Sequence, residues 1–147
     1  MRLSSVGTIV SLLFAPAFLL YINYFNPDKS SFFYLGAKMV PPLFASVFFF
    51  LFSAAYIGKK HLVLSFTKRF YKKDLEREEE EYLKGGDAYW MGITFLNTMI
   101  LINMSIFADN LTWAFYSSVG WYIFFGFALL LQVAYGKLYK FNSKENL

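Results

Sequence analysis

Few side chains in this sequence have the chemistry of a catalytic or metal site, and their spacing does not fit one. The chain has no cysteine, and His61 is its only histidine, so thiolate sites and multi-histidine metal sites are excluded. The acidic run from Asp74 to Glu81 lacks the spacing of a calcium-binding loop and is most simply a solvated helix end. No nucleophile stands beside a base, and no glycine loop could hold a phosphate. We therefore expect a protein that is not an enzyme and has no cofactor, metal or small-molecule substrate.

The clearest chemical feature is a cluster of basic residues. Residues 59–73 include six basic side chains and no acidic one. The six are Lys59, Lys60, Lys68, Arg69, Lys72 and Lys73. Such a cluster suits anionic lipid headgroups, the phosphates of a large polyanion such as ribosomal RNA, or an acidic protein. The residues themselves leave these three partners open.

The elements that must position this cluster are membrane-spanning helices. Hydrophobic residues make up 57% of the 147 residues and charged residues only 16%, whereas a soluble domain is roughly a quarter charged. The apolar residues are gathered in segments long enough to cross a bilayer. They predict spans at about 4–25, 39–58, 89–107 and 111–135. We expect an all-α polytopic membrane protein, with residues 1–147 forming a single four-helix membrane domain.

Basic residues also predict the orientation of the chain. The connection 59–88 has eight Lys and Arg residues, whereas the connection between the last two predicted spans has none. Arg2 precedes the first span, and Lys137, Lys140 and Lys144 follow the last. The positive-inside rule therefore places both termini and the connection 59–88 in the cytoplasm.

The same connection has the pattern of helices. Leu62, Phe66 and Phe70 recur four residues apart, which is typical of an amphipathic helix. A straight helix over 59–84 would rise about 39 Å from the membrane, and two glycines could not bring the chain back. We therefore expect an amphipathic helix lying along the headgroups or a helical hairpin turning near 73–75. Gly85 and Gly86 should end this helix, and Asp87 should cap the third span.

Small and polar residues inside the spans predict helix packing. Gly7, Ser11 and Ala15 form a ridge of small residues on the first span, which permits close helix contact. Asn97 and Asn103 are polar residues inside the third span, and Asn97 lies beside a polar stripe that includes Thr94, Thr98 and Ser105. This stripe either makes hydrogen bonds between helices or lines a pore, and packing is the simpler interpretation.

Three segments, in order along the chain, resemble a known family. "LFSAAYIGKKHLVLSFTKRFYKKDLERE" (51–78) resembles its apolar helix leading into a basic arm, "DAYWMGITFLNTMILINMSIFADN" (87–110) its third span, and "AFYSSVG" (114–120) the start of its last span. This family is the gamma subunit of the translocon-associated protein (signal sequence receptor) complex of the endoplasmic reticulum. The resemblance implies four spans, cytosolic termini and a non-enzymatic subunit that supports protein translocation. It also implies other membrane subunits as partners, and contact with ribosomal RNA or ribosomal protein through the six basic residues.

Other functions fit the same composition. A bacterial inner-membrane immunity protein against a pore-forming bacteriocin is also small, aromatic and free of charge inside the membrane. An accessory subunit of a respiratory or other large membrane complex and a passive oligomeric channel are further alternatives. These functions would place the chain in the bacterial or the mitochondrial inner membrane instead of the endoplasmic reticulum.

Overall fold

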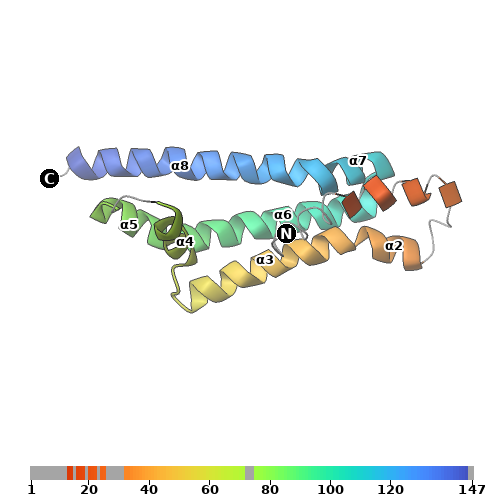
Figure 1. Ribbon diagram of the computed structural model, residues 1–147, viewed down its shortest axis with the longest axis horizontal. Helices are drawn as coiled ribbons and strands as arrows, with labels where there is room; N and C mark the ends of the chain where they lie inside the picture. The colour runs from red at the N-terminus through yellow and green to blue at the C-terminus, as the bar shows by residue number, and fades with distance from the viewer. Residues whose placement is uncertain are drawn as a thin grey trace. The chain divides into compact units, whose positions relative to one another are not determined.

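The computed structural model describes residues 13–14, 16–18, 20–22, 24–25, 32–71 and 75–145. This part of the chain is helical and has no strand, which confirms the all-α prediction. The described residues between 13 and 25 are helical. The helices that follow are α2 (Phe32–Lys38), α3 (Val40–Ile57), α4 (Leu62–Phe70), α5 (Arg77–Lys84), α6 (Gly86–Phe107), α7 (Asn110–Phe115), the π-helical turn η1 (Tyr116–Gly120) and α8 (Trp121–Glu145) (Figure 1).

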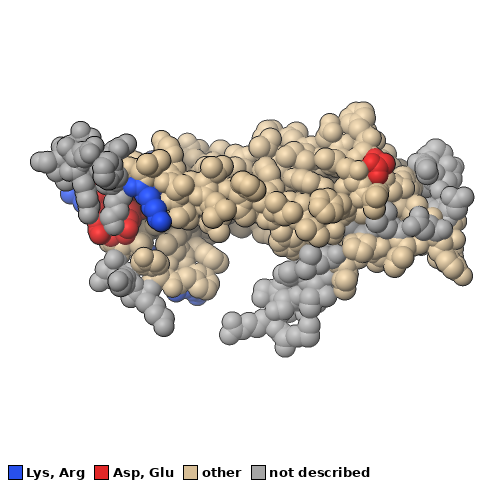
Figure 2. Space-filling model, turned by 90° about the horizontal axis from the view of Figure 1, so that it is seen from above, with Lys and Arg blue, Asp and Glu red and all other residues tan. Residues whose placement is uncertain are grey.

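Three helical stretches are long and apolar enough to cross a membrane. They are Val40–Ile57, Arg77–Phe107 and Asn110–Tyr139, and they correspond to the second, third and fourth predicted spans. The first predicted span, at about 4–25, lies largely outside the described residues. Most of the face seen in Figure 2 shows no charged side chain, as expected for helices that contact lipid.

Contacts divide the chain into two compact units. Unit 1 comprises Met1–Ser46 and Leu96–Phe124, and unit 2 comprises Val47–Phe95 and Phe125–Leu147. The long helices α3, α6 and α8 each contribute residues to both units.

In unit 1, two prolines explain the break between α2 and α3. A proline has no N–H, so Pro42 cannot donate to the carbonyl of Lys38 four residues earlier, and Pro41 has the same defect. The Lys38 carbonyl instead accepts hydrogen bonds from the Ser105 hydroxyl at 2.7 Å and from the Trp113 indole N–H at 3.2 Å. The interrupted helix is thereby tied to α6 and α7.

The core of unit 1 is aromatic. Trp113 is completely buried, and its ring meets that of Phe18 edge to face at 5.6 Å. Ile22, Tyr34 and Ala114 complete this cluster. It fixes the start of α7 against α2 and against the described residues between 13 and 25.

In unit 2, α6 and α8 lie side by side and are joined by polar contacts (Figure 1). The Tyr89 hydroxyl donates to the carbonyl of Ala128 at 2.7 Å, and the Trp90 indole N–H donates to the side-chain oxygen of Gln132 at 2.8 Å. Hydrogen bonds of this kind hold membrane helices together because lipid offers their polar groups no alternative partner.

Candidate functional site

The connection between α3 and α6 in unit 2 consists of two short helices in contact with each other, α4 and α5. We call residues 59–84 the α4–α5 connection. This arrangement agrees with the hairpin alternative predicted from the sequence. The turn was expected near 73–75, and residues 72–74 are outside the described residues.

The connection begins with a tight reversal of the chain after α3. Lys59 and His61 both have left-handed backbone conformations, with φ of 50° and 47°. Non-glycine residues rarely adopt this conformation, because the Cβ atom crowds the backbone. The amide of Lys60 closes the turn by donating to the carbonyl of Ala55 at 3.0 Å.

A buried carboxylate on α6 fixes the start of α4. Asp87 is only 2% exposed, and its two oxygens accept hydrogen bonds from the amides of Leu62 and Val63, both at 2.9 Å. These amides belong to the first turn of α4, where no carbonyl of the helix can accept from them. The negative charge also stands at the positive end of the helix dipole. Asp87 therefore holds α4 in place from a different helix.

This contact corrects the expectation that Asp87 caps the third span. Only Gly85, with helical φ and ψ of −76° and −10°, separates α5 from α6. Asp87 therefore lies inside the first turn of α6 rather than before it, and its side chain is free to serve α4. Gly86 makes this possible, because a Cβ atom there would lie 2.8 Å from Cγ1 of Val63.

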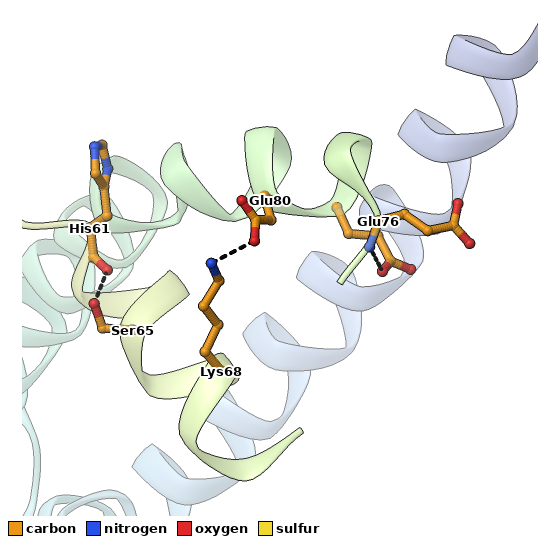
Figure 3. Close-up of polar contacts among 6 residues, drawn as sticks. His61, Ser65, Lys68, Glu76 and Glu80 are labelled. Carbon is orange, nitrogen blue, oxygen red and sulfur yellow. Dashed lines mark hydrogen bonds and ion pairs between the residues drawn. The ribbon is translucent and has the colours of Figure 1, made fainter. Parts of the chain in front are cut away.

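The acidic second half of the connection folds back onto the basic first half. Lys68 of α4 and Glu80 of α5 point toward each other and form an ion pair at 2.5 Å (Figure 3). Within α5, Glu76 and Glu79 form a capping box at the N-terminus, and Arg77 pairs with Glu81 at 3.3 Å. Figure 2 accordingly shows basic and acidic side chains next to one another. The charges separated along the sequence are thus adjacent in space.

The basic residues predicted as a contact surface now differ in their surroundings. Lys59, Lys60 and Arg69 are exposed, and Lys68 is half exposed but paired with Glu80. Lys72 and Lys73 fall outside the described residues. Part of the predicted cationic charge is therefore neutralised by the protein's own acidic helix.

Two exposed aromatic rings lie on α4 together with Lys68 and Arg69. Phe66 and Phe70 are 63% and 69% exposed, and their rings lie 4.8 Å apart. The buried residue of α4 is Leu64. The ridge of Phe66 and Phe70 that the sequence pattern singled out therefore faces away from the rest of the unit. Phe66 and Arg69 line a shallow hollow of about 250 Å³ on this face.

Two of the residues predicted for helix packing, Asn97 and Asn103, lie in unit 1. Asn97 is completely buried, and its side-chain oxygen accepts a hydrogen bond from the Tyr116 hydroxyl at 3.0 Å. Asn103 is exposed. Gly7, Ser11 and Ala15 fall outside the described residues.

A second polar site was not found from the sequence. In unit 1, Lys38 is only 4% exposed, donates to the carbonyl of Ala108 at 3.1 Å and lines a cavity of about 420 Å³. Asp109 lines the same cavity, as do Tyr34 and Asn110, and the Tyr34 hydroxyl donates a hydrogen bond to the side-chain oxygen of Asn110. A single lysine at a span end gave no signal for this site, because such residues are common in membrane proteins.

Comparison with known proteins adds no assignment. No protein-family model matches the chain, and neither does any curated protein or solved structure. The function of the chain is therefore inferred from its residues, their contacts and the ordered resemblance described above.

Proposed function

We propose that this protein is a non-enzymatic subunit of a membrane complex that binds an anionic partner on the cytoplasmic side through its α4–α5 connection. The partner that fits the resemblance to the translocon-associated gamma subunits is ribosomal RNA or ribosomal protein. The proposal includes four spans, cytoplasmic termini, other membrane subunits as neighbours and the endoplasmic reticulum as location. The observation that carries it is the joint exposure of Lys59, Lys60 and Arg69 with the ring pair Phe66 and Phe70.

The chemistry of this surface favours a partner that offers both phosphates and flat apolar groups. Lys and Arg bind phosphates and release their counterions, which makes such binding sensitive to salt. Exposed aromatic rings stack on unpaired bases, and arginine adds a planar cation. Phe66 and Arg69 line one hollow, so a single nucleotide could contact both.

The rigidity of α4 supports the same proposal. A recognition surface binds more tightly when it needs no ordering on contact. Asp87 fixes the first turn of α4, and the ion pair of Lys68 with Glu80 fixes its last turn against α5. The amide of Lys60, which donates to the carbonyl of Ala55 at 3.0 Å, closes the preceding turn.

Salt-dependent co-sedimentation with ribosomes tests this function. The full-length protein in detergent would be compared with the triple variant Lys59→Glu, Lys60→Glu and Arg69→Glu. We expect the variant to bind at least about tenfold more weakly at low salt. The log–log slope of affinity against salt should become shallower by about 2–3, since each of the three lost phosphate contacts removes roughly 0.7–0.9 from it.

The matched control is Lys137→Glu, which reverses an exposed charge on α8 outside the connection. It should bind ribosomes as the unaltered protein does. Unchanged binding by the triple variant would contradict the proposal. Binding of the unaltered protein to anionic vesicles but not to ribosomes would assign the surface to lipid headgroups instead.

A further inference from the structure

The cavity in unit 1 lies at the ends of candidate membrane spans. Its lining comes from the end of α2, the end of α6 and the residues that lead into α7. The apolar stretches begin at Val40, end at Phe107 and begin again at Asn110, so this lining is next to the ends of three candidate spans. The volume of about 420 Å³ is within the range of small-ligand sites. A ligand here would be in the headgroup region of the bilayer.

Two opposite charges line this cavity without neutralising each other directly. Lys38 and Asp109, both within the described part of the chain, form no ion pair within 4.0 Å. Among the described residues, the Lys38 ammonium has a single hydrogen-bond acceptor, the carbonyl of Ala108, so N–H groups remain for another acceptor. Burial lowers the pKa of Lys38, and the charge of Asp109 acts in the opposite direction.

The carboxylate of Asp109 keeps its negative charge. The Thr112 hydroxyl donates to it at 2.6 Å, and the amides of Leu111 and Thr112 donate at 2.9 and 3.0 Å. These hydrogen bonds hold the pKa of Asp109 below its ordinary value. The cavity is thus lined by a carboxylate and a lysine amino group, each held by hydrogen bonds.

The surroundings keep Lys38 in place and add an apolar rim. The ammonium lies 5.9 Å from the centre of the Tyr34 ring and 5.7 Å from that of Trp113, which favours a cation at this position. Leu35 and Ile106 line the cavity and are both about half exposed. A ligand with a charged head and an apolar tail therefore finds a complement for each part.

We propose that this cavity binds the headgroup of a zwitterionic phospholipid that has a phosphate and a primary ammonium, with the phosphate on Lys38 and the ammonium on Asp109. A purely anionic headgroup would be repelled by Asp109 and would offer it no cation, and a quaternary ammonium has no N–H group to donate to Asp109. The apolar rim of Leu35 and Ile106 fits the beginning of the acyl chains, which favours a lipid over the free headgroup.

Native mass spectrometry of the full-length protein tests this site. The protein would be released from nanodiscs that contain equal amounts of phosphatidylethanolamine and phosphatidylglycerol. We expect it to retain phosphatidylethanolamine at least about fivefold over phosphatidylglycerol. Asp109→Asn should reverse the preference, because it leaves a net positive lining, while Asn still accepts from the amides at the start of α7. Lys38→Met should abolish retention of both lipids.

Two controls keep the result specific. Lys137→Gln, remote in sequence from the cavity lining, should behave as the unaltered protein. Lys38 is buried, so Lys38→Met could fail to fold. In that case the lipid preference of Asp109→Asn, measured on a variant with an unchanged melting temperature, tests the site by itself. Equal retention of both lipids by the unaltered protein, or an unchanged preference in Asp109→Asn, would overturn the site. Displacement of the lipid by equimolar soluble phosphoethanolamine would show that the cavity binds the free headgroup rather than a lipid.

Discussion

At the scale of single residues, glycines without any functional group determine how neighbouring side chains pack against a helix. Gly136 on α8 gives room to Tyr82, whose hydroxyl donates to the carbonyl of Gln132 at 2.6 Å. A Cβ atom at Gly136 would lie 2.8 Å from Cε1 of that ring. Sequence inspection cannot find this contact, because a glycine in an apolar helix is compatible with many neighbours.

Gly136→Ala should therefore lower the stability of unit 2. The ring of Tyr82 must move and lose its hydrogen bond, at a cost of about 1–3 kcal/mol. Gly126→Ala on the same helix is the matched control, since nothing lies within 4 Å of its would-be Cβ atom. Thermal unfolding in detergent should show a lower melting temperature for the first variant only. Equal melting temperatures would show that Tyr82 does not pack against α8 as described.

At the scale of helices, the sequence predicted the elements better than their partners. The apolar periodicity indicated α4, and the length of the connection indicated that it must fold back. The sequence pattern did not predict that Asp87 caps α4, because the two hydrogen bonds join residues that are 24 and 25 positions apart. Nor did it predict that Lys68 would pair with Glu80, since basic and acidic residues in separate runs of a sequence suggest separate surfaces. Long-range pairing of this kind depends on the fold and leaves no local pattern.

Asp87→Ala should loosen the first turn of α4. The amides of Leu62 and Val63 would lose their acceptors, which costs about 1–2 kcal/mol and corresponds to roughly 5- to 30-fold faster hydrogen exchange at these two positions. Asp87→Asn keeps one acceptor oxygen without the charge and should give an intermediate rate. Hydrogen–deuterium exchange with fragmentation measures this. Exchange at Leu62 and Val63 that is the same in all three proteins would contradict the role of Asp87.

At the scale of the whole molecule, composition was the most informative feature of the sequence. Apolar segments without charge predicted helices long enough to span a membrane, and three such helices are found in the described chain. The partner and the location of the protein could not be predicted in the same way. They depend on the detailed shape and chemistry of surfaces, which composition describes only as basic or apolar. The cavity beside Lys38 illustrates this, since it is formed by residues from three separate helix ends.

Side-specific labelling tests the central proposal that the α4–α5 connection faces the cytoplasm. The chain has no cysteine, so single replacements Lys60→Cys, in the connection, and Lys29→Cys, between the first two predicted spans, each create one thiol. With a membrane-impermeant maleimide, we expect Lys60→Cys to react only from the cytoplasmic side and Lys29→Cys only from the opposite side. Reaction of Lys60→Cys from the opposite side, or of both thiols from one side, would contradict the proposed topology and with it the cytoplasmic recognition surface.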